Sequence, residues 1–86
     1  MKIKIGGINY KVIYVSGLAD SGSTDFDKSI ILINKNQTKE RQLSALYHEM
    51  IEVWNEHGDL NLSHQTIQTL ESMMFQTLKD NKIILK

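Results

Sequence analysis

Residues 46–67, LYHEMIEVWNEHGDLNLSHQTI, join two segments of helical periodicity and decide how the second half of the chain folds. Before Gly58 the apolar residues recur at steps of three and four, which predicts a helix with one core-facing stripe. Glycine is a frequent stop at the end of a helix, and Ser63 suits the N-cap of a following one. The stretch therefore predicts two helices joined by a short loop.

Each of these helices has an expected start and an expected apolar stripe. The first begins after Thr38 as N-cap, and its stripe consists of Leu43, Leu46, Tyr47, Met50, Ile51 and Trp54. The second follows Ser63, and its stripe consists of Ile67, Leu70, Met74 and Leu78. Asp80-Asn81 ends the second helix, and the closing KIILK (82–86) is predicted as a tail or a short added strand.

The first half of the chain has the period of two that is typical of strands. In KIKIGGINYKVIYV (2–15) apolar and polar residues alternate, and Gly6-Gly7 fits a two-residue hairpin turn or a sharp bend. SGLADSGS (16–23) is predicted as a loop, and TDFDKSIILIN (24–34) as a second hairpin turning near Asp27-Lys28. Its last strand, Ser29–Asn34, is apolar enough to lie centrally or against a helix. The prediction is an α+β fold, one domain over residues 1–86, with a small antiparallel sheet packed on two C-terminal helices.

Composition excludes several classes of function. The chain has 10 basic and 10 acidic residues and no cysteine, so it offers neither a disulfide nor a thiolate metal site. Its apolar runs are too short to cross a bilayer, and its N-terminus alternates instead of forming the apolar stretch of a signal peptide. We therefore expect a cytoplasmic protein without a membrane partner.

Nucleic-acid binding is the weakest of the functional alternatives. Lys2, Lys4 and Lys11 are expected along one rim of the first hairpin, where Tyr10 and Tyr14 could stack on bases. Zero net charge gives no overall attraction to a polyanion, and lysines on a short edge strand commonly prevent aggregation. No nucleic-acid partner is expected.

The segment His48-Glu49-Met50-Ile51-Glu52 carries the candidate chemistry. His48 and Glu52 are four residues apart, the spacing at which one helix presents two ligands to a zinc ion. Glu49 directly follows the first ligand, where such sites keep a general base. Both candidate ligands lie opposite the apolar stripe, so a solvated charged face is the competing interpretation. Such a face predicts nothing else nearby, whereas a zinc site needs a third ligand and a water-exposed opening.

Three residues are candidates for that third ligand. His57 lies just before the expected helix end, His64 opens the second helix, and Glu71 lies two turns further on the same side. Glu71 falls in the apolar stripe, an unfavourable place for an unpaired carboxylate. His64 is preferred, because two histidines and one carboxylate are typical of hydrolytic zinc sites.

The chain resembles small zincin-like metallopeptidase domains of phages and mobile elements, with the layout of the ImmA/IrrE and SprT-like groups. The resemblance is carried by INYKVIYV, STDFDKSIILIN, RQLSALYHEMIEVWN and LKDN. It implies a zinc-dependent hydrolase with a first ligand at His48 and a general base at Glu49, whereas Glu52 stands where the family usually has histidine. It also implies that the last strand lies beside the cleft and can pair with an extended peptide.

Two functional hypotheses follow from these residues. The first is a zinc-dependent metallopeptidase of phage or mobile-element origin, hydrolysing peptide bonds in the cytoplasm of the bacterial host. The alternative is a non-catalytic phage protein that uses a degenerate zincin scaffold to bind a host or phage protein. The first predicts bound zinc, and the second predicts none.

Overall fold

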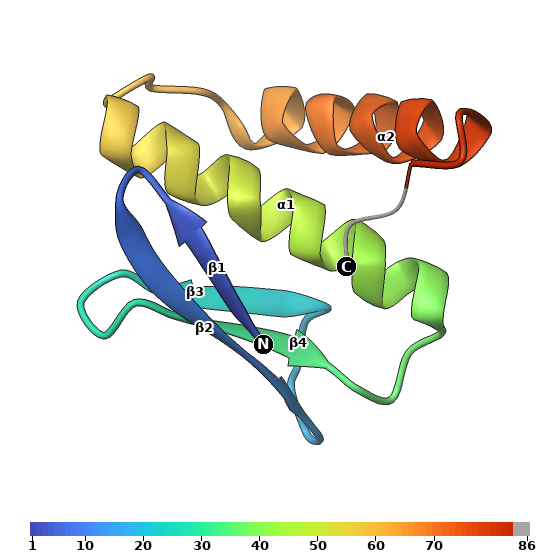
Figure 1. The fold of residues 1–86 in the computed structure, drawn as a ribbon, viewed down its shortest axis with the longest axis horizontal. Helices are drawn as coiled ribbons and strands as arrows, with labels where there is room; N and C mark the ends of the chain where they lie inside the picture. The colour runs from blue at the N-terminus through green and yellow to red at the C-terminus, as the bar shows by residue number, and fades with distance from the viewer. Residues whose placement is uncertain (84–86) are drawn as a thin grey trace.

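The computed structural model describes residues 1–83, which form a four-stranded sheet and two helices (Figure 1). The elements are β1 (Lys2–Ile5), β2 (Ile8–Val15), β3 (Gly22–Asp25), β4 (Ile30–Asn34), α1 (Lys39–Gly58) and α2 (His64–Asp80). The predicted α+β class is confirmed. Neither of these helices has the length and apolar character that crossing a bilayer requires. Residues 84–86, most of the closing KIILK, lie outside the described part of the chain.

The sheet is mixed, with strand order β1-β2-β4-β3. Both predicted hairpins are antiparallel, and the first turns through Gly6 and Gly7, whose φ angles of 57° and 81° suit a two-residue turn. The hairpins are joined by a parallel pair, in which Val12 of β2 lies opposite Ile31 of β4. The expectation of an antiparallel sheet therefore holds within each hairpin and fails between them.

The character of β3 and β4 explains this order. Ile31 and Ile33 of β4 are fully buried, and a central position gives that strand a hydrogen-bonded neighbour on each side. β3 has the short polar sequence GSTD, which suits an edge. The loop before β3 is held by Asn34, whose Nδ2 donates to the carbonyl oxygens of Leu18 and Asp20 at 3.3 and 3.4 Å. β4 thus lies centrally, one of the two positions expected for it.

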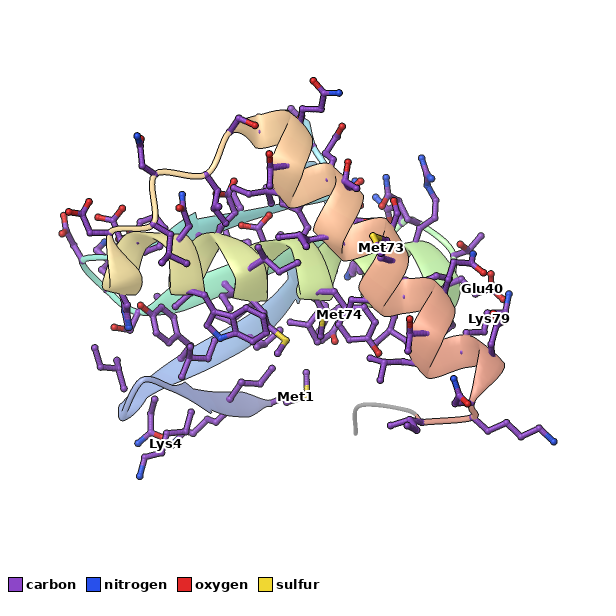
Figure 2. The ribbon with its side chains drawn as sticks, turned by 90° about the horizontal axis from the view of Figure 1, so that it is seen from above. Met1, Lys4, Glu40, Met73, Met74 and Lys79 are labelled. Atoms are coloured by element: carbon purple, nitrogen blue, oxygen red, sulfur yellow. The ribbon has the colours of Figure 1, made fainter. Side chains whose placement is uncertain are left out.

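The helices form two further layers on one side of the sheet (Figure 1). α1 lies across the strands, and α2 packs on α1 without its backbone approaching any strand. Both predicted N-caps are confirmed, since the Thr38 and Ser63 hydroxyls accept from backbone N–H groups three residues on. Figure 2 shows Lys79 of α2 beside Glu40 of α1, with 3.2 Å between Nζ and Oε1. This exposed pair adds at most about 1 kcal/mol.

The layering changes which helix residues are buried. Leu46 and Ile51 are buried as predicted, but Trp54 is 43% exposed and Val53 is fully buried in its place. On α2, Ile67 is buried whereas Leu70 is 42% exposed. The predicted stripe of α1 was wrong at Trp54 because α1 is covered by the sheet on one side and by α2 on another. The buried surface of α1 is therefore two faces, not one stripe. The predicted stripe of α2 was wrong at Leu70, because α2 packs on α1 alone among the described elements and Leu70 lies outside the face that is buried there.

Candidate metal centre

Three potential ligands, His48, Glu52 and His64, lie together on one side of the helix pair. On α1, His48 Nε2 lies 3.5 Å from Glu52 Oε2, and the two side chains are 15% and 31% exposed. The His64 ring meets the His48 ring edge to face, with 5.6 Å between centroids. One ligand atom from each residue lies within 4.8 Å of the other two. These are the three residues that the sequence analysis named.

The connection between the helices places His64. α1 ends at Gly58, its C-cap Asp59 adopts the left-handed conformation (φ 50°), and Leu60 fills the space beside the glycine. The Asn55 side chain accepts from the backbone N–H of Leu62 at 2.9 Å. The chain therefore turns back along α1, and His64 in the first turn of α2 comes to lie beside His48.

The cluster lies in an open cleft of about 750 Å³. Its walls come from residues 20–24 and Phe26, from one face of α1 and from the first half of α2. The expected solvated face of α1 is therefore a cleft wall, with β3 on one side of it and α2 on the other. The strand beside the cleft is β3, not the last strand, β4, because β4 is central and β3 is the edge.

Glu49 is buried at the base of this cleft, with 7% of its surface exposed. Thr24 of β3 donates its hydroxyl to Oε1 at 2.7 Å. A Cβ on Gly22 would lie only 3.3 Å from Glu49 Cγ, so glycine at that position leaves room for the carboxylate. Burial raises the pKa of Glu49, and the hydrogen bond from Thr24 opposes that shift.

The other two candidates for the third ligand have different environments. Glu71 is 19% exposed, accepts a hydrogen bond from Ser44 Oγ and lies 3.3 Å from His48 Nδ1. Its carboxylate is therefore paired, although it lies in the expected apolar stripe. His57 lies outside the cluster, where its Nε2 forms a hydrogen bond with the Tyr10 hydroxyl at 2.8 Å.

Sequence reasoning missed two partners in the cleft, Ser44 and Thr24. Ser44 had a detectable signal, because it lies four residues before His48 and so on the same helical face. Thr24 had none, since its contact with Glu49 joins residues 25 apart in the chain.

The donor set fits a zinc ion. Two imidazoles and one carboxylate are ligands that zinc accepts, at about 2.0–2.2 Å from each donor atom. Tetrahedral geometry then places donor atoms about 3.4 Å apart, so a spread of up to 4.8 Å closes by small side-chain rotations. His64 is exposed and free to make that movement.

We expect the metal-free Glu49→Gln protein to be more stable than wild type in neutral buffer, by about 1 kcal/mol. The amide still accepts from Thr24 but carries no charge to bury. The pKa of Glu49 is higher in the folded protein than its ordinary value of 4.5, so protonation of Glu49 favours folding. Wild type has this stabilisation in full below pH 4.5 and loses it as the pH rises through the folded pKa. Urea unfolding across pH measures the difference, which should vanish in acid. A difference independent of pH would contradict the prediction.

Comparisons with known proteins found no match. No protein-family model matches the chain, and no similar curated protein or solved structure was found. The zincin resemblance therefore stays a prediction based on the sequence motifs. His48, Glu52 and His64 nevertheless form a cluster of potential ligands in an open cleft.

Proposed function

We propose that this protein is a zinc-dependent hydrolase that cleaves peptide bonds in the cleft beside β3. One observation carries the proposal: His48, Glu52 and His64 meet in a cleft whose base holds the buried carboxylate of Glu49. A solvated charged face would not bring a histidine from a second helix to this place, nor a carboxylate against an edge strand. The proposed setting is the cytoplasm of the bacterial host of a phage or mobile element.

His48, Glu52 and His64 would hold the metal, and Glu49 would act as the base. A bound zinc ion supplies a Lewis acid that polarises the peptide carbonyl and activates a water molecule. Thr24 fixes Glu49 Oε1, while Oε2 accepts no hydrogen bond from the described residues and is left to take a proton. Glu49 removes that proton as the water oxygen bonds to the carbonyl carbon. It then delivers the proton to the amine nitrogen as the C–N bond breaks.

Burial suits Glu49 to this role. A general base works best when its pKa approaches the working pH, and burial raises the pKa of this carboxyl group. The Thr24 hydroxyl also restricts the rotation of the carboxylate. Both effects come from the contact between α1 and β3.

The edge strand supports a peptide substrate. β3 pairs with β4 on one side, and its other edge pairs with no strand in residues 1–83. Residues 21–24 line the cleft, so an extended peptide hydrogen-bonded to β3 would lie close to Glu49.

Metal titration tests the proposal. Untagged, metal-free protein is titrated with Zn²⁺ against a chromophoric chelator, and Co²⁺ spectra report the ligand geometry. We expect one equivalent to bind to wild type and the affinity to fall on the order of 100-fold in His48→Ala. His57→Gln is the matched control, because it removes an imidazole outside the cluster, and it should bind as wild type does.

Absence of zinc binding by folded wild-type protein would overturn the enzyme proposal. The alternative, a non-catalytic scaffold that binds a host or phage protein, would then take its place. Equal affinity in wild type and His48→Ala would mean that any bound metal lies elsewhere.

A further inference from the structure

Glu71 of α2 contacts α1 beside the candidate ligand His48 and so joins the two helices. Its Oε2 accepts from Ser44 Oγ, and its Oε1 lies 3.3 Å from His48 Nδ1. Ser44 and His48 are four residues apart on α1, so one carboxylate contacts two successive turns of that helix. At 19% exposure, Glu71 is held in this position by both contacts.

The contact with Glu71 determines which nitrogen of His48 is free. Carboxylate oxygens accept hydrogen bonds, so the contact between Glu71 Oε1 and His48 Nδ1 favours the tautomer that carries its proton on Nδ1. The other nitrogen, Nε2, points toward Glu52, with 3.5 Å to Oε2. Nε2 forms no hydrogen bond with Glu52 at this distance, so in the Nδ1–H tautomer Nε2 is the atom available to a metal, and Glu71 contacts the other nitrogen of the ring.

We propose that Glu71 is a positioning residue that orients His48 for metal binding and is not itself a ligand; the metal-binding part of this inference rests on the proposed function. Histidine ligands generally donate their second ring N–H to a carboxylate, which fixes the tautomer and increases the basicity of the ligating nitrogen. Each Glu71 oxygen already has a partner on α1. The set of atoms within ligand reach of one another contains His64 and not Glu71.

The Ser44 hydroxyl holds the second oxygen of the Glu71 carboxylate. Without that hydroxyl, Oε2 would have no hydrogen-bond donor among the described residues and the carboxylate would be free to rotate away from His48. The contacts of Glu71 with Ser44 and with His48 exist only when α2 packs on α1. The orientation of the His48 imidazole therefore depends on that packing. α2 supplies both one ligand, His64, and the group that orients another.

The test compares Glu71→Gln with Glu71→Met in the metal-free and zinc-loaded proteins. Glutamine keeps an acceptor oxygen for His48, whereas methionine has a similar shape and no acceptor of comparable strength. Long-range ¹⁵N–¹H NMR of the metal-free protein, in mildly alkaline buffer, should show the Nδ1–H tautomer of His48 in wild type and Glu71→Gln. Glu71→Met should move the ring toward the Nε2–H form. Gln68→Met, on the same helix and in the same cleft, should leave the tautomer unchanged.

Zinc affinity provides the second readout. We expect a loss of about 10–100-fold in Glu71→Met and a smaller loss in Glu71→Gln. An equal, severe loss in both variants would overturn the inference, because an amide does not replace a ligating carboxylate. An unchanged tautomer in folded Glu71→Met would overturn it as well. If the tautomer shifts as expected but wild type binds no zinc, the orientation of His48 by Glu71 stands and the proposed function fails.

Discussion

Replacing Glu49 by glutamine is expected to lower the rate of peptide hydrolysis about 10²–10⁴-fold, the usual contribution of a positioned general base. The amide still accepts from Thr24 but takes no proton from water, so the loss falls on the chemical step. Zinc stoichiometry should stay at the wild-type value, because Glu49 is not one of the three clustered ligands. New N-termini released from an unfolded protein substrate, counted by mass spectrometry, measure the rate.

Glu56→Gln is the matched control, because Glu56 is an exposed acid of α1 outside the cleft. It should hydrolyse the substrate at the wild-type rate. Full activity in zinc-loaded Glu49→Gln would remove Glu49 from the mechanism. The greater stability expected of Glu49→Gln makes unfolding a poor explanation for any loss.

Truncating Ile31 to alanine is expected to destabilise the fold by about 2–5 kcal/mol. Ile31 is fully buried in β4, one of the two inner strands, so the change removes apolar contacts and leaves a cavity in the core. Domains have about 5–15 kcal/mol of total stability, so this single change removes a large share of it. Urea unfolding followed by circular dichroism measures the loss.

Ile8→Ala makes the same chemical change at a residue of β2 that is 43% exposed. It should alter the free energy of unfolding by no more than about 0.5 kcal/mol. Equal losses at Ile8 and Ile31 would contradict the placement of Ile31 in the core and of Ile8 at the surface.

Local sequence signals predicted the elements well. The turn at Gly6-Gly7 and the caps at Thr38 and Ser63 depend on neighbouring residues, and all three are confirmed. α1 ends at Gly58 as expected, although Asp59 is the residue that takes the left-handed conformation, and Gly58 makes room for Leu60. Interactions between residues close in the sequence decide such features, so the local sequence is enough to predict them.

Contacts with distant residues were the source of the errors. Trp54 was expected in the core and is exposed, because helical periodicity cannot indicate that two different layers cover α1. The parallel pairing of β2 with β4 was missed, because a period of two marks strands without naming their neighbours. The last strand was expected beside the cleft, and that place belongs to β3.

For the candidate site, the sequence by itself determined that His48 and Glu52 share one face of a helix, since 3.6 residues per turn leave no other arrangement. Only the tertiary structure decided that this face is a cleft wall, that His64 lies beside His48, and that Glu71 contacts Nδ1 of His48. The burial of Glu49 against Thr24 was likewise decided only by the tertiary structure. Each of these contacts joins residues at least 16 positions apart in the sequence, and the packing of β3 and α2 against α1 brings them together.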